Sequence, residues 1–148
     1  MKVNTKTRYG LRTMIEIALQ ENNRGILQKD IAKREDISEK YLDHIIAGLK
    51  AAGLITNVAG KKSGYMLTQP ANELTTYDIY KAFNNDLALA DCLEQGKHCN
   101  KEEFCAANDF WNELNDHIKE KMNSVTLKQL AEKQNELHNQ SGPQLYYI

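Results

Sequence analysis

Three cysteines within 14 residues are the side chains of this sequence best suited to chemistry. They are Cys92, Cys99 and Cys105, spaced Cys-x6-Cys-x5-Cys. Structural zinc sites use cysteines two to four residues apart, and no such pair occurs here. The residues between these cysteines are mostly polar, which indicates a loop and not a core strand. Three thiolates on a flexible loop suit an iron–sulfur cluster, while a thiol redox switch and the absence of any function stay open.

Charged neighbours would tune these thiols. Lys97 and Lys101 would favour the thiolate form and offset the negative charge of a cluster. His98 lies next to Cys99, but adjacent residues rarely point at each other, so a catalytic dyad is not expected. The sequence has no glycine-rich phosphate loop, nucleophile elbow or metallohydrolase motif. We therefore expect a protein that is not an enzyme.

A second set of chemically suited residues is basic and lies in the first half of the chain. Residues 1–65 carry a net charge of +5 and residues 66–148 carry −6, although the whole chain is close to neutral. This asymmetry predicts an anion-binding surface on the first half. Two lysines, Lys61 and Lys62, stand between Gly60 and Gly64, at the expected tip of a hairpin.

Three helices are expected to carry the basic residues. The first has an apolar stripe from Leu11 to Leu19, with Asn4 or Thr5 as its cap, and the second spans Leu27 to Glu35. The third begins after Ser38, a good N-cap, and ends at Gly53, where a left-handed glycine would stop it.

Two β-rich runs, 54–58 and 65–68, follow these helices and predict a hairpin. Helix, helix-turn-helix and hairpin, in that order, are typical of a winged helix-turn-helix domain that places its third helix in the major groove. Lysines would contact phosphates, and Asp43 could accept a hydrogen bond from cytosine. The expected DNA-binding residues are Gln28, Ser38, Lys40, Tyr41, Asp43, His44, Lys50, Lys61 and Lys62.

Helices return after Pro70. A short helix is expected from Leu74 to Phe83 with Thr76 as its cap, and a long one from Phe104 to Met122. The long helix carries an apolar stripe without an obvious partner in the chain, which favours packing against a second copy. A last short helix would include Leu127 and Leu130.

The expected fold is mainly α with a small β-hairpin wing, and three regions are expected. Residues 1–70 form the winged helix-turn-helix domain, 71–135 the cysteine loop and dimerisation helices, and 136–148 a tail. No apolar run is long enough to span a membrane, and the N-terminus has no apolar signal core. We therefore expect a cytoplasmic protein that does not contact membranes, in which disulfides are not expected.

The sequence resembles the IscR/NsrR/CymR family of bacterial winged helix-turn-helix regulators, in particular its cluster-binding branch. The resemblance covers roughly residues 1–135. It is carried by Lys6-Thr7-Arg8-Tyr9-Gly10-Leu11, Ile37-Ser38-Glu39-Lys40-Tyr41-Leu42, Leu49-Lys50-Ala51-Ala52-Gly53-Leu54-Ile55, Gly64-Tyr65 and the three cysteines. It implies a transcriptional regulator, most simply a repressor, that binds palindromic operators as a homodimer.

The resemblance also implies a cofactor, an iron–sulfur cluster of the [2Fe–2S] type held by Cys92, Cys99 and Cys105. IscR-type members have a histidine three residues after the last cysteine, whereas this chain has Asn108. The fourth ligand is therefore unassigned, with His98, Glu102, Glu103 or an outside thiol or water as candidates.

Two alternatives to cluster control stay open. The first is a cluster-free regulator that senses oxidants through its thiols. The second uses the C-terminus, Gln144-Leu145-Tyr146-Tyr147-Ile148. A free terminal isoleucine resembles the tail with which serine acetyltransferases bind cysteine synthase, so that enzyme is a candidate partner through Ile148. Docking of the tail onto its own dimer is the simpler interpretation.

Overall fold

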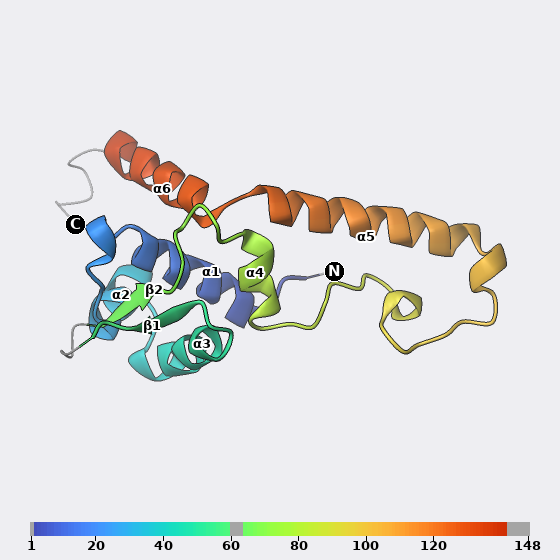
Figure 1. The fold of residues 1–148 in the computed structure, drawn as a ribbon, viewed down its shortest axis with the longest axis horizontal. Coiled ribbons are helices and arrows are strands. Elements are labelled where there is room, and N and C mark those ends of the chain that lie inside the picture. Colours follow the sequence, from blue (N-terminus) through green and yellow to red (C-terminus); the bar gives the residue numbers. More distant parts are fainter. Residues whose placement is uncertain (1, 60–63, 142–148) are drawn as a thin grey trace.

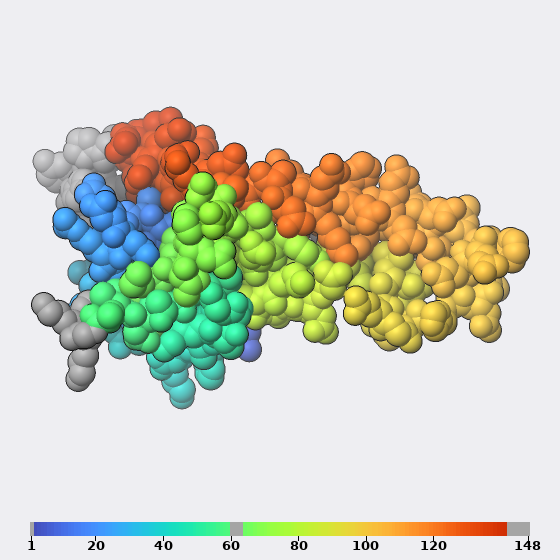
Figure 2. All heavy atoms as spheres, in the orientation of Figure 1, coloured from blue at the N-terminus to red at the C-terminus, as the bar shows by residue number. Residues whose placement is uncertain are grey.

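The computed structural model describes residues 2–59 and 64–141, and it has a bulky end and a slender arm (Figures 1 and 2). The bulky end contains α1 to α4, the hairpin and α6. The arm consists of α5 and the cysteine loop, residues 91–105, which lies beside the start of that helix. The structure therefore places the basic domain and the cysteines at opposite ends of the molecule.

The central helix of the bulky end is α1, Thr5–Ala18, which contacts α2, α3, α4 and α6. It begins at Asn4, whose side chain accepts a hydrogen bond from the Thr7 N–H, so the first of the two expected caps is the one used. A short 3₁₀ turn, Glu21–Asn23, follows. The core below α1 is aliphatic and completely buried; its members include Met14, Ile17, Ile31, Leu42, Ile45 and Leu49.

The helix-turn-helix consists of α2, Gln28–Glu35, and α3, Glu39–Ala51. The turn is tight because Asp36 adopts the left-handed conformation with φ +52°. Ser38 caps α3 by accepting the Tyr41 N–H at 3.0 Å, and Gly53 follows the helix with φ +74°. Both expected ends of the third helix are confirmed.

The wing is an antiparallel pair of β1, Ile55–Asn57, and β2, Tyr65–Leu67, with Ile55 opposite Leu67. Ile26, just before α2, forms a bridge with Tyr65 and so joins the wing to the helix-turn-helix. Gly64 makes this approach possible, because a Cβ there would lie 1.9 Å from the Ile26 carbonyl oxygen. A hairpin that follows the three helices along the chain is as expected.

The remaining helices differ in detail from the sequence prediction. The helix α4, Thr76–Lys81, is capped by Thr75, which forms a reciprocal capping box with Asp78, so the assignment of the cap to Thr76 was wrong. The last helix, α6, spans Leu127–Ser141, is longer than expected and packs on α1. It continues through residues 136–141, which were expected to belong to the tail.

The long helix, α5, spans Ala106–Ser124 with Cys105 as its N-cap. Phe104 therefore does not belong to it, contrary to expectation. Phe104 is the last residue of a 3₁₀ turn, Glu102–Phe104, and its side chain is 90% exposed. A cysteine in the extended conformation just before the helix breaks the periodic pattern that seemed to include Phe104.

The face that α5 buries inside the chain is polar. Asn108 and Asn115 are its buried residues, and Asn115 bonds the segment that leads to the cysteine loop. The apolar stripe lies to one side and stays partly open, with Phe110 56% and Trp111 40% exposed. The helix thus has an internal partner that its apolar pattern did not reveal, and Phe110 and Trp111 are left for another surface.

Candidate nucleic-acid interface and cysteine loop

The outer face of α3 carries the polar residues expected there. Lys40, Asp43, His44 and Lys50 are all exposed, while Leu42, Ile45, Ile46 and Leu49 are buried on the opposite side. The burial of one stripe fixes the helix on the core. The polar face therefore stands rigidly on the surface of the domain, next to the N-terminus of α2 and the wing.

Asp43 is held in place by Gln28. The Gln28 side-chain N–H₂ group donates hydrogen bonds to the Asp43 carboxylate and to the Glu39 carbonyl, the latter at 3.2 Å. Tyr65 of the wing donates its hydroxyl proton to the Gln28 carbonyl oxygen, also at 3.2 Å. Gln28 therefore links α2, α3 and the wing, and Tyr65 is a participant that the sequence reasoning missed.

Two other expected DNA-binding residues have contacts inside the protein. The Lys50 ammonium donates to the Asn57 side chain at 2.7 Å and lies 5.6 Å from the centre of the Tyr65 ring. Tyr41 packs edge-on against Tyr9 of α1, with the ring centres 5.7 Å apart. These contacts hold the wing and α1 against α3. Lys61 and Lys62 lie outside the described residues, as do residues 142–148, which end with Ile148.

The three cysteines are free thiols distributed along the loop. Cys92 lies in a 3₁₀ turn, Asp91–Leu93, Cys99 is exposed, and Cys105 caps α5. The Cys105 sulfur accepts the Asn108 N–H at 3.4 Å, so the N-terminal end of the helix faces this thiol. Within the part of the chain that the structure describes, no three His, Cys, Asp or Glu side chains are grouped closely enough to hold a metal ion.

The donor types of the loop fit an iron–sulfur cluster, whereas their positions require the loop to close. Three sulfurs on a largely exposed loop without regular helices or strands can be brought together with little loss of packing. Lys97 forms an ion pair with Glu94 at 2.6 Å, and this hydrogen bond raises the pKa of Lys97. Asn108, at the position of the missing histidine, is buried and accepts a hydrogen bond from Asn112.

A strap, residues 83–90, joins α4 to the cysteine loop and is attached to α5 by Asn115 and Lys119. The Asn115 side chain accepts the Leu89 N–H at 3.0 Å and donates to the Leu87 carbonyl at 2.9 Å. Lys119 forms an ion pair with Asp86 at 2.8 Å, and Tyr77 also donates to Asp86. The hydrogen bond from Lys119, followed by that from Tyr77, lowers the pKa of Asp86.

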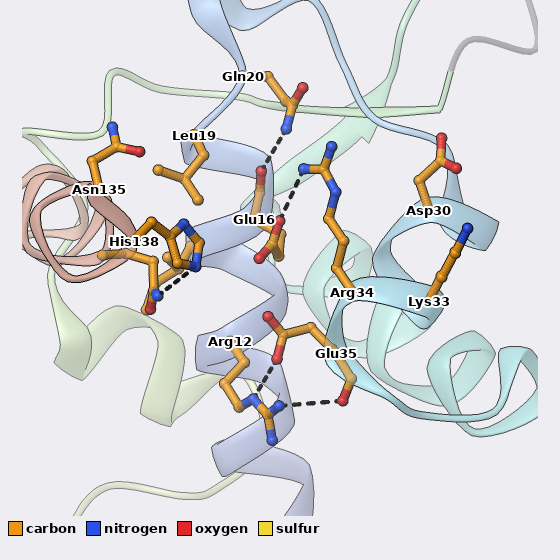
Figure 3. A pocket seen from close by; sticks show the side chains of 12 residues that line it. Arg12, Glu16, Leu19, Gln20, Asp30, Lys33, Arg34, Glu35, Asn135 and His138 are labelled. Carbon is orange, nitrogen blue, oxygen red and sulfur yellow. Dashed lines mark hydrogen bonds and ion pairs between the residues drawn. The ribbon is translucent and has the colours of Figure 1, made fainter. Parts of the chain in front are cut away.

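A polar hollow of about 1280 Å³ lies between α1, α2 and α6, away from these two sites (Figure 3). Inside it, Arg34 pairs with Glu16 at 3.2 Å and Arg12 pairs with Glu35. Burial is the main cause that raises the pKa of Glu16, while the hydrogen bond from Arg34 opposes it. Because its central charges are paired with one another, the hollow indicates no particular ligand.

The comparison with protein families decides what these elements belong to. The model of the Rrf2 family, described as an iron-dependent transcriptional regulator, matches residues 3–133. The chain belongs to the Rrf2 family. The resemblance inferred from the sequence is thereby confirmed. So is the expectation of a non-enzyme, because the relatives are named as transcriptional regulators.

The individual relatives include proteins named CymR and IscR, the names that the sequence resemblance had suggested. Protein rrf2 of Nitratidesulfovibrio vulgaris is 34% identical over 88% of this chain and 87% of its own. The structure of CymR, the global cysteine regulator of B. subtilis, matches with a TM-score of 0.73 and 30% identity over 90% of this chain and 98% of its own. The structure of T. potens IscR matches with a TM-score of 0.74 and 28% identity over 93% of this chain and 90% of its own.

These matches establish a winged helix-turn-helix regulator of the IscR and CymR type, in agreement with the expected fold class. They include both CymR and IscR, so they leave the choice between cluster control and thiol control to experiment. Among the helices that the structure describes, none has the length and apolar character required to cross a membrane.

Proposed function

We propose that this Rrf2-family regulator binds palindromic operator DNA as a homodimer, and that an iron–sulfur cluster on Cys92, Cys99 and Cys105 controls its affinity. The observation that carries the proposal is the connection between its two ends. A rigid, polar-faced α3 stands at one end, a loop with three thiols at the other, and the strap joins them. A change in the loop can thus reach the DNA-binding domain.

The DNA contacts follow from the outer face of α3. Lys40 and His44 are exposed and would meet phosphates or base edges, whereas Asp43 is held by Gln28 for a specific contact. Ser38 presents the N-terminus of α3 to a phosphate. The proposed DNA-binding set is the one expected from the sequence, with Lys50 and Tyr41 acting mainly through the wing and α1.

A second copy of this chain is the proposed occupant of the apolar seam on α5. The seam comprises Ala107, Phe110, Trp111, Leu114 and Ile118 and runs along most of a 19-residue helix. Such a helix is self-complementary when paired with its own copy, and two-fold symmetry suits a palindromic operator. Two recognition helices would then lie about one DNA turn, ~34 Å, apart.

The proposed cofactor rests on the chemistry of the donors and on the description of the family as iron-dependent. When bound, an iron–sulfur cluster supplies metal–sulfur bonds that oxidants or iron shortage can break. The residues of the cysteine loop would then pass this change on to the DNA-binding domain. Their three thiols would draw the loop together, and the strap would change its pull on the DNA-binding domain.

The decisive experiment is anaerobic purification followed by counts of iron and sulfide and an absorption spectrum. We expect visible absorbance in the wild type, and we expect Cys92→Ala, Cys99→Ala and Cys105→Ala each to lose it while staying folded and dimeric. A cysteine variant that keeps its full iron and sulfide content would exclude that residue as a ligand. If the wild type forms no cluster, control by thiol oxidation takes its place.

DNA binding is tested separately, with a duplex selected by the wild type from a random library. Affinity for this duplex should exceed that for a shuffled duplex and should fall steeply with salt, because lysine–phosphate contacts release counterions. Equal affinity for both duplexes would contradict operator recognition without bearing on the cluster.

A further inference from the structure

We infer that Phe83, the first residue of the strap, is the positioning residue through which the cysteine loop sets the placement of α3 on DNA. This inference rests on the proposed function, and it identifies how the two ends of the molecule communicate. It is carried by three features: the seat of the Phe83 ring, the anchors of the strap at each end, and the hollow beneath it.

The Phe83 ring is seated between α1 and α3 at two glycines. A Cβ added to Gly10 of α1 would lie 2.2 Å from Cε2 of the ring, and one added to Gly48 of α3 would lie 2.6 Å from Cε1. Both distances are far below van der Waals contact, so the ring occupies space that any other residue at these positions would fill. Because Gly48 lies on the recognition helix, a displaced ring must move α3 or leave a void against it.

Asn84 anchors the strap directly after this ring. Its side-chain N–H₂ group donates to the Thr7 hydroxyl at 2.7 Å and to the Tyr80 carbonyl at 2.8 Å. Its carbonyl oxygen accepts from Asn4, the cap of α1, at 2.7 Å. The start of the strap is therefore attached to the N-terminus of α1 and to the end of α4.

The far end of the strap is anchored to α5, next to the cysteines. Asn115 is 6% exposed and bonds the backbone at both Leu87 and Leu89. Leu87 is itself buried, and the turn that contains Cys92 begins directly after the strap. Movement of Cys92 therefore pulls on a segment whose other end is Phe83.

Between its anchors the strap crosses a hollow of about 500 Å³. Its lining includes Tyr80, Asn84 and Asp86, together with Leu93 and Gln95 of the cysteine loop. The turn around Cys92 can therefore move towards α4 without displacing core side chains. Because the strap is bonded to α5 near the cysteine loop and to α1 and α4 beside Phe83, a displacement of the Cys92 turn is passed along it to the ring.

The test perturbs the loop chemically and reads α3 by hydrogen–deuterium exchange. N-ethylmaleimide alkylates cysteine thiols, and this chain has three cysteines, all in the loop. In the full-length wild type we expect complete labelling to change amide exchange in residues 39–51 by about twofold or more. This readout uses neither DNA nor a cluster, so its failure is distinguishable from failure of the proposed function.

Two variants, one in the strap and one at its anchor on α5, should remove the α3 response without preventing labelling. Phe83→Leu replaces the ring that lies against Gly48 with a smaller side chain, and Asn115→Ala removes both hydrogen bonds to the strap. Phe104→Leu, at an exposed ring outside the strap and the seam, and Asn112→Ala on α5 are matched controls that make the same chemical changes, and they should keep the full response. Circular dichroism verifies folding, and if Phe83→Leu does not fold, Asn115→Ala carries the test.

A second arm reads DNA directly, with the duplex selected by the wild type. Gly48→Ala should weaken binding at least tenfold, because its methyl group collides with the ring, and the double variant Phe83→Leu/Gly48→Ala should regain most of the loss. A wild type whose α3 exchange ignores labelling, or strap variants that respond as the wild type does, would overturn the inference. So would a double variant that binds no better than Gly48→Ala.

Discussion

Thr7 and Thr13 both lie buried on α1, yet their hydroxyl groups have different surroundings. The Thr7 hydroxyl donates to Asn4 and accepts from Asn84, at 2.8 and 2.7 Å. The Thr13 hydroxyl is completely buried, and within the described residues it has no hydrogen-bond partner. An unpaired buried hydroxyl costs free energy because it has lost its water and gained nothing in return.

We predict that Thr13→Val stabilises the protein, since valine has nearly the same shape and no hydroxyl group to desolvate. The free energy of unfolding should rise by about 1 kcal/mol. Thr7→Val, as the matched change, should lower it by a similar amount because Asn84 loses a partner. Urea unfolding followed by circular dichroism measures both. A loss of stability in Thr13→Val would show that its hydroxyl is satisfied, for instance by water.

Glu16 of α1 makes the stability of the folded chain depend on pH. It is 5% exposed, and burial raises its pKa above the ordinary 4.5, with the neighbouring Glu35 adding to the effect and Arg34 opposing it. A raised pKa means that the folded chain binds this proton more tightly than the unfolded chain. The contribution of Glu16 to stability is therefore greatest below pH 4.5 and is lost as the pH rises through the raised value.

We predict that Glu16→Gln increases the melting temperature near neutral pH, because glutamine keeps an acceptor for Arg34 without the buried charge. The difference from the wild type should shrink as the pH falls towards 4.5. Thermal unfolding between pH 4.5 and 8 measures this trend. A variant that is less stable than the wild type throughout would show that the pair with Arg34 outweighs the burial of the carboxylate.

Asp43 and Gln28 together predict a change in DNA specificity. Asp43→Ala should relax discrimination at one base pair, with a loss of ~1–3 kcal/mol of specificity. Gln28→Ala should cause part of the same loss, because the carboxylate is then free to rotate. Binding to the selected duplex and its single-base variants measures the effect. An unchanged preference in the Asp43 variant would remove this residue from base readout.

At the scale of elements, a capping box fixes the N-terminus of α4, the helix that leads into the strap. Thr75 accepts the Asp78 N–H, and Asp78 in turn accepts the Thr75 N–H at 2.8 Å. A helix of six residues depends on such a cap because it has few internal hydrogen bonds. The adjacent Thr76 has another task, donating to the Met122 carbonyl of α5 at 2.6 Å.

We predict that Thr75→Ala destabilises the protein by about 1 kcal/mol, the usual contribution of an N-cap. Thr75→Ser retains the hydroxyl and should stay close to the wild type. Chemical unfolding compares the three proteins. Equal stability of the alanine and serine variants would contradict the role of this cap.

At the scale of the whole molecule, the seam on α5 predicts the state of assembly. Trp111→Glu places a charge in the middle of the seam and should convert the proposed dimer to a monomer, since burying an unpaired carboxylate is strongly unfavourable. Asn123→Glu adds the same charge at an exposed position elsewhere on α5 and should leave the dimer intact. Sedimentation equilibrium reads the mass directly. A dimeric Trp111→Glu protein would exclude this seam.

Most of the DNA-binding domain was predictable from the sequence because its signals act over short distances. Ser38 caps a helix that starts at the next residue, and Gly53 ends that helix with a positive φ. The polar and apolar faces of α3 follow from the periodicity of a single helix. The same holds for the order of helices and hairpin, which is sufficient to suggest the winged helix-turn-helix fold.

The helices of the DNA-binding domain, the wing and the three thiols on one loop could thus be predicted from the order of the amino acids. The residues that connect the two ends became visible once the helices were packed together. Asn84 bonds Thr7 across 77 positions of sequence, and Asn115 bonds Leu87 across 28. Such contacts carry no periodic or capping signature, because they depend on how α1, α4 and α5 pack together. The ring of Phe83 is the clearest case, since two glycines in different helices make its seat only after both helices are in place.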